Sequence, residues 1–207
     1  MKELFNSWKE VMFNPLEFYQ KLPKKTKYRG PSLFYLKINA LTLGLMYLLL
    51  LIIGAFFILF MGALGGPLGI IGGGFGLVAL VIAVLLYPLF LLLSWGLLFA
   101  GAGITHLFVL MFGGKQGYAE TFKVQAYAVA PVIFSVIPYI GYAATIYTLV
   151  LEVIGIHHRQ KLSWGKSVAV IILPIVILTV LVIGIMYAIF ASLLTTSMVT
   201  GLPGGLS

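Results

Sequence analysis

The stretch "ITHLFVLMFGGKQGYAETF" (residues 104–122) contains the end of one long apolar run and the start of another. A histidine, His106, lies inside the first run, which stops at the double glycine of positions 113–114. The first charged residues beyond the glycines are Lys115 and Glu120. Short cytoplasmic loops of membrane proteins are enriched in lysine and arginine, so a lysine between two apolar runs indicates the side on which their connection lies. This stretch therefore decides the membrane topology of the two helices that it joins.

The composition is that of an integral membrane protein. Of the 207 residues, 61% are hydrophobic and only 9% are charged, whereas soluble domains carry about 25% charged residues. Several apolar runs exceed the roughly 18 residues that mark a membrane helix. The chain has no cysteine, which excludes disulfides and thiolate chemistry. In a membrane protein the net charge of +8 indicates a cytoplasmic face with anionic lipids, and we expect no nucleic-acid partner.

We predict an all-α membrane protein with five transmembrane helices, at about 33–61, 70–112, 118–137, 139–156 and 167–194. The second block is ambiguous, because as one helix it measures roughly 65 Å, about twice the hydrocarbon core. It is either two spans bent at Pro88 or one span preceded by an outer segment. The glycine-rich sequence "MGALGGPLGIIGGGFG" (61–76) is expected to be that flexible or re-entrant outer segment.

Charge counting decides between the two alternatives. With one crossing in the second block, all 13 lysines and arginines lie on the side of the N-terminus. With two crossings, the last five move to the other side and the split becomes eight to five. The positive-inside rule favours the five-span topology, with the N-terminus in the cytoplasm and the C-terminus outside.

The N-terminal segment is predicted to be an amphipathic helix at the cytoplasmic interface. Apolar residues recur from Leu4 to Met12 at the spacing of one helix face, with Trp8 in the centre. A basic cluster follows and suits anionic headgroups. The predicted organisation is therefore an amphipathic and basic segment (1–30), a transmembrane domain (31–198) and a short outer tail (199–207). The residues predicted to face lipid or a partner are Trp8, Lys24, Lys25, Lys27 and Arg29.

The candidate polar site consists of His106, Glu120 and Glu152, since ionisable groups within membrane helices usually face the bundle interior. His106 and Glu152 each lie roughly 8–10 Å inside the cytoplasmic boundary and are therefore at comparable depth. One interpretation is a site that binds a divalent cation, with His106 and Glu152 as ligands, or that relays protons. The other, which we favour, is an interhelical hydrogen bond from His106 to a carboxylate or a backbone carbonyl group. No catalytic triad, zinc-protease helix or phosphate loop is present, so we expect neither an enzyme nor a cofactor.

Several motifs resemble those of Yip1-domain membrane proteins. The longest is "HLFVLMFGGKQGYAETFKVQAYAVAP" (106–131); "WKEVMFNPLEFYQKL" (8–22), "IPYIG" (137–141) and "LVLEVIGIHHRQKLSWGKSVAV" (149–170) are similar to other parts of the pattern. The resemblance implies five transmembrane helices and a cytosolic N-terminus. Eukaryotic members are associated with Rab-type GTPases and vesicle traffic. This chain lacks their long polar N-terminal domain and contains no aspartate, so it resembles the short prokaryotic branch and is expected in a prokaryotic cell membrane.

The function expected from these observations is that of a non-enzymatic membrane protein. It would organise the membrane or recruit protein or lipid partners at the cytoplasmic face. One alternative is a small transporter or channel for ions, protons or lipids that uses the His and Glu residues within the membrane, and another is a metal-dependent membrane enzyme. Membrane lipids, a cytoplasmic protein and a second copy of the chain are the partners that this reading allows.

Overall fold

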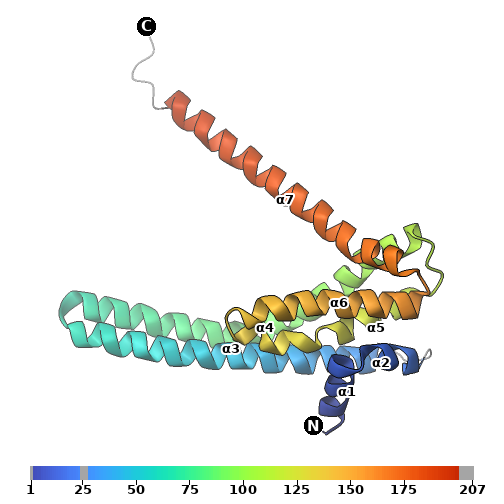
Figure 1. Ribbon diagram of the computed structural model, residues 1–207. Helices are drawn as coiled ribbons and strands as arrows, with labels where there is room; N and C mark the ends of the chain where they lie inside the picture. The colour runs from blue at the N-terminus through green and yellow to red at the C-terminus, as the bar shows by residue number, and fades with distance from the viewer. Residues whose placement is uncertain (1, 24–27, 201–207) are drawn as a thin grey trace.

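The computed structural model describes residues 2–23 and 28–200, and within these residues it is all-helical (Figure 1). This confirms the predicted all-α class. The elements are α1 (Lys2–Phe13), α2 (Pro15–Lys21), α3 (Arg29–Leu64), α4 (Gly66–Met111), α5 (Tyr118–Ala128), the 3₁₀ helix η1 (Ala130–Val136), α6 (Ile140–Gln160) and α7 (Trp164–Thr200). Over the described ranges, α3, α4, α6 and α7 are long and apolar enough to cross a membrane. The fifth predicted span is not confirmed.

Helices α3 and α4 form a long antiparallel hairpin that extends well beyond α5 and α6 (Figure 1). The second apolar block is one continuous helix that runs through Pro88, so no break divides it into two spans there. The other alternative, one span preceded by a flexible or re-entrant segment at 61–76, also differs from the structure, because α3 ends at Leu64 and α4 begins at Gly66. Gly65 and Gly66 have φ angles of 67° and 65°, a region that glycine adopts without steric cost. Two glycines thus suffice to reverse the chain.

The double glycine at 113–114 ends α4 with a Schellman motif. Gly113 has a φ of 89°, and its N–H donates to the carbonyl oxygen of Leu110 at 3.0 Å. The N–H of Gly114 donates to the carbonyl oxygen of Val109 at 2.8 Å. These are the two bonds that satisfy the free carbonyl groups at a helix C-terminus, so the glycines stop α4 and direct the chain into α5.

The predicted continuous span at 118–137 is wrong. Helix α5 ends at Ala128 and the chain continues as the 3₁₀ helix η1. Pro131 explains the break, because its ring lacks an N–H and clashes with the carbonyl group four residues earlier. Its ring also disfavours helical geometry at the preceding residue. Helix α6 then returns antiparallel to α5, so these elements form a second hairpin whose two ends lie at the same end of the molecule (Figure 1).

Helix α5 is the centre of the packed region. Every residue from Glu120 to Ala128 except Gln125 and Tyr127 is buried. Phe122 and Ala126 pack towards α3 and α4, in a cluster with Tyr35 and Ala102. Val124 packs on the opposite side against residues of α2, α4, α6 and α7. Neighbouring helices rather than lipid therefore cover α5 on both of these sides.

Helix α7 packs against the bundle only near its start and then diverges from it (Figure 1). Val170 and Ile171 are buried, whereas the large hydrophobic side chains from Ile172 to Leu194 are exposed, Val180 and Leu193 among them. A bare apolar helix of this kind is stable only in an apolar solvent such as a bilayer.

Candidate functional site

A buried cluster of charged side chains joins α5 and α6. Glu120 lies at its centre and accepts a hydrogen bond from Lys123 Nζ at 2.8 Å through Oε1. Through Oε2 it accepts one from Arg159 Nε at 2.6 Å, and Arg159 Nη2 completes the ion pair. The relative exposures of Glu120, Lys123 and Arg159 are 9%, 1% and 8%. Buried charges are costly unless they are paired, so these three side chains depend on one another.

The same two cations hold the N-terminal segment against the bundle. Arg159 Nη1 donates to the carbonyl oxygens of Leu22 at 2.6 Å and Tyr19 at 3.3 Å. Lys123 Nζ donates to the carbonyl oxygen of Pro23 at 3.0 Å. The last carbonyl groups of a helix have no partner within it and carry partial negative charge, which makes basic side chains favourable partners. The cluster therefore receives the C-terminal end of α2.

Tyr19 completes this attachment from the apolar side. Its ring is fully buried, and its hydroxyl donates to the carbonyl oxygen of Val124 at 3.3 Å. Burial, followed by the negative charge of Glu152, raises the pKa of Tyr19 well above its ordinary value. A Cβ atom at Gly155 would lie 3.0 Å from the Tyr19 ring and 2.5 Å from Val124, so the glycine of α6 provides the space that the ring needs.

Helix α1 is attached to η1 and to α6 by one hydrogen bond each. The indole N–H of Trp8 donates to the carbonyl oxygen of Ala130 at 2.9 Å. The hydroxyl of Tyr147 donates to the carbonyl oxygen of Met12 at 2.5 Å. Val11 is fully buried. Trp8 is thus engaged in an internal contact, and its predicted contact with lipid stays a prediction. Arg29 is exposed as the first residue of α3, and Lys24, Lys25 and Lys27 lie outside the described residues.

The three predicted polar residues do not converge. His106 Nδ1 is hydrogen-bonded to Thr121 Oγ1 at 2.9 Å, and Thr121 also accepts from Gln160 Nε2 at 2.9 Å. This chain of hydrogen bonds joins α4, α5 and α6, but the partner of His106 is a hydroxyl group and not the carboxylate or backbone carbonyl group that we expected. Glu120 instead pairs with the two cations. Glu152 is partly buried, and in the described part of the chain it makes no hydrogen bond or ion pair.

No group of three or more His, Cys, Asp or Glu residues suited to a metal ion occurs within residues 2–23 and 28–200. The metal ligands predicted at His106 and Glu152 therefore gain no support from a neighbouring third ligand. His157 is likewise engaged elsewhere, with Nδ1 bonded to the carbonyl oxygen of Leu162 at 2.6 Å. Its ring stacks on Trp164 with the centroids 4.0 Å apart.

Four members of the buried network were not predicted from the sequence: Thr121, Lys123, Arg159 and Gln160. The charges of Lys123 and Arg159 were used only to assign the side of the membrane on which the loops lie. A usable signal was present, because Glu120 and Lys123 are three residues apart, which places them on one face of a helix. The partner on α6 carried no such signal, since contacts between distant segments depend on how the helices are rotated.

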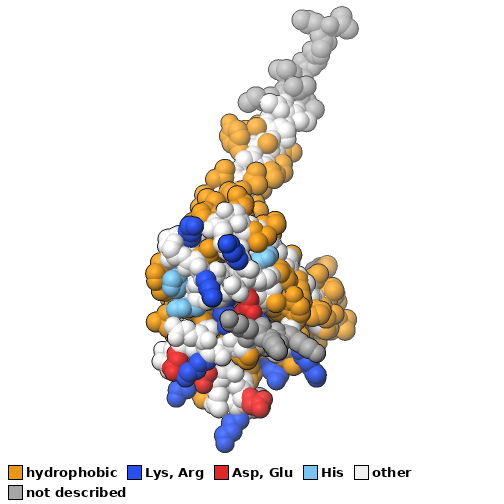
Figure 2. Space-filling model, turned by 90° about the vertical axis from the view of Figure 1, so that its right-hand side faces the viewer, with side chains coloured by type: hydrophobic (Ala, Val, Ile, Leu, Met, Phe, Trp, Pro, Cys, Tyr) orange, Lys and Arg blue, Asp and Glu red, His pale blue; other side chains and the backbone are white. Residues whose placement is uncertain are grey.

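The charged side chains gather over the body of the molecule, and hydrophobic side chains cover the projecting helix α7 (Figure 2). Together with the long apolar helices, this distribution defines a multi-pass membrane protein. The family model of the Yip1 domain matches residues 9–186, and the chain belongs to the Yip1 family. No curated protein and no solved structure matches it.

Proposed function

We propose that this Yip1-family protein organises the membrane or recruits partners at its cytoplasmic face and catalyses no reaction. The observation that carries the proposal is the attachment of the N-terminal segment. Its inner face is fixed by Trp8, Tyr19 and the buried charged cluster. Its outer face carries exposed charged side chains and the exposed aromatic ring of Phe5. A segment held in this way presents a preformed surface rather than a loose tether, which lowers the entropic cost of binding.

The test must leave the attachment intact. Deletion of residues 1–30 would remove the Tyr19 ring from the core and the carbonyl groups that Arg159 binds, so loss of function would be uninterpretable. The double variant K2E/K9E changes two exposed lysines of α1 and keeps Phe5, whose ring stacks on Trp8 with the centroids 5.9 Å apart. The matched control is K115E, a charge reversal in the α4–α5 connection, where the lysine is also exposed.

The assay is proximity labelling in the native host by an enzyme fused to the N-terminus. We expect a defined set of neighbours that K2E/K9E loses and K115E retains, at equal membrane abundance of all three proteins. Identical neighbours for the wild type and K2E/K9E would contradict recruitment through α1.

One observation favours transport as a second candidate. Glu152 lies within a candidate span and, among the described residues, is without an ion-pair partner, and ionisable groups at such positions commonly mark ion or proton pathways. In proteoliposomes, proton flux under a pH gradient that E152Q abolishes would support this candidate. Wild-type flux equal to that of empty liposomes would remove it.

A further inference from the structure

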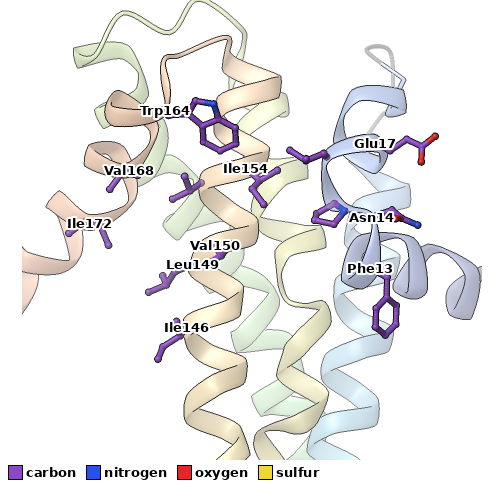
Figure 3. A pocket seen from close by; sticks show the side chains of 13 residues that line it. Phe13, Asn14, Glu17, Ile146, Leu149, Val150, Ile154, Trp164, Val168 and Ile172 are labelled. Carbon is purple, nitrogen blue, oxygen red and sulfur yellow. The ribbon is translucent and has the colours of Figure 1, made fainter.

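An apolar groove of about 730 Å³ lies between the α1–α2 corner, α6 and α7 (Figure 3). Ile146, Val150 and Ile154 of α6 form its floor, and Trp164 and Val168 of α7 form one wall. The opposite wall is the corner at residues 13–17. The volume is within the range of about 300–1,000 Å³ typical of small-molecule sites. Asn14 and Glu17 are the polar residues of the lining, so the groove suits an apolar ligand.

The groove opens towards the bilayer. Its floor and wall belong to two candidate membrane-spanning helices, and Ile146, Val150 and Val168 are exposed by 65%, 43% and 44%. Exposed apolar side chains on such helices face hydrocarbon, because water would be a poor solvent for them. The α1–α2 corner, however, stands on the side of α6 opposite to α7 and makes the apolar surface between them concave. A chain that enters from the bilayer would therefore be enclosed by protein on three sides.

The chain on both sides of Trp164 carries positive charge at one end of the groove. Trp164 follows Lys161 by three residues and precedes Lys166 by two, and both lysines are exposed without lining the groove. The carboxylate of the lining, Glu17, is paired with Lys21, and no acidic residue follows Glu152 in the sequence to offset the two lysines. Trp164 itself is 49% exposed, and tryptophan is enriched where the hydrocarbon meets the headgroups. Charge and polarity thus change along the groove as they do along a phospholipid.

We propose that this groove binds one anionic phospholipid, with an acyl chain along α6 and the phosphate beside Lys161 and Lys166. The charge complementarity at the Trp164 end selects the headgroup, and the apolar floor holds the chain. The inference is independent of partner recruitment by α1, since it concerns a surface of α6 and α7 and is read out by lipid binding alone.

The test uses the full-length protein, delipidated in detergent and mixed with equal amounts of phosphatidylglycerol and phosphatidylcholine of the same acyl chains. Native mass spectrometry counts the lipids that remain bound. We expect one retained phosphatidylglycerol in the wild type. Two lysines near an anionic headgroup correspond to a preference of about 30-fold over the zwitterionic lipid, and K161Q/K166Q should remove this preference.

A second pair of variants tests the floor. V150W places a large ring in the groove and should abolish retention of the lipid. V180W, the matched control, makes the same substitution at a position of α7 that is 63% exposed and does not line the groove. If V150W fails to fold, K161Q/K166Q still decides the matter, because it changes only exposed residues. Equal retention of the two lipids by the wild type, equal retention by V150W and V180W, or a dimer that excludes lipid from the groove would each overturn the proposal.

Discussion

The substitution Glu120→Gln tests whether the buried charged cluster holds the molecule together. The glutamine keeps the shape of the side chain but leaves Arg159 and Lys123 without a carboxylate. These cations are 8% and 1% exposed, so water cannot take its place. Removal of one partner from a buried ion pair typically costs about 3–5 kcal/mol. Folding free energies are about 5–15 kcal/mol, so the variant should lose a large part of its stability.

The assay is reversible unfolding by titration with sodium dodecyl sulfate in mixed micelles, with hydrogen exchange of α2 as a local readout. We expect E120Q to unfold at lower detergent fraction and the amides of α2 to exchange faster, because Arg159 binds the carbonyl groups at the end of that helix. The double variant E120Q/R159M should be less damaged than the sum of the two single variants, with a coupling of about 0.5–3 kcal/mol.

The control is E17Q, which breaks the exposed pair of Glu17 and Lys21, whose side chains are 60% and 73% exposed. It should leave the unfolding midpoint unchanged. The reasoning would be refuted if E120Q cost less than about 1 kcal/mol, the value of an exposed ion pair, or if it behaved like E17Q.

Two further predictions concern packing and threading. Gly155→Ala places a methyl group 2.5 Å from a Val124 carbon, and it should lower the free energy of unfolding by about 1–3 kcal/mol in the same titration. The control is Gly103→Ala, where the added methyl group meets no atom within 4 Å; it should be neutral or stabilise α4 by up to about 1 kcal/mol. Because the chain has no native cysteine, Lys115→Cys and Lys161→Cys can be labelled singly with an impermeant maleimide. Both should react from one side of the membrane and a cysteine in the α3–α4 turn from the other; labelling of the two lysine positions from opposite sides would contradict the α5–α6 hairpin.

The sequence was informative where one local signal dominates. The length of the apolar runs predicted the helical membrane class, and the double glycine at 113–114 marked the end of α4. Charge counting favoured a single crossing for the second block; α4 is continuous, and the number of crossings stays a prediction. Patterns that depend on context were less informative. Glycines at 66–76 indicated a flexible segment, yet these residues are helical, since packing against a neighbour overrides the low helix propensity of glycine.

The candidate site shows the same limit in another form. Depth along a helix can be read from the number of residues, and His106 and Glu152 were placed at similar depth in this way. The rotation of each helix about its own axis cannot be read from the number of residues. This rotation directs the side chain of His106 to Thr121 rather than to a carboxylate. The partners of Glu120 come from α5 and from the distant α6. Local spacing can find the first of these partners, but only the assembled fold reveals the second.

The length of α4 has a consequence for the membrane itself. With 46 residues the helix measures about 69 Å, and even at a tilt of about 40°, the upper end of the usual range, its vertical extent exceeds 50 Å. A hydrocarbon core of about 30 Å cannot cover it. Hydrophobic mismatch of this size is relieved by stronger tilt, by thickening of the bilayer or by association of helices.

We therefore expect the tilt of the α3–α4 hairpin, measured by polarised infrared spectroscopy, to decrease as the lipid chains lengthen. A tilt that does not respond to chain length would show that other contacts set it. Bilayer thickness thus becomes a physical variable that this fold has to accommodate.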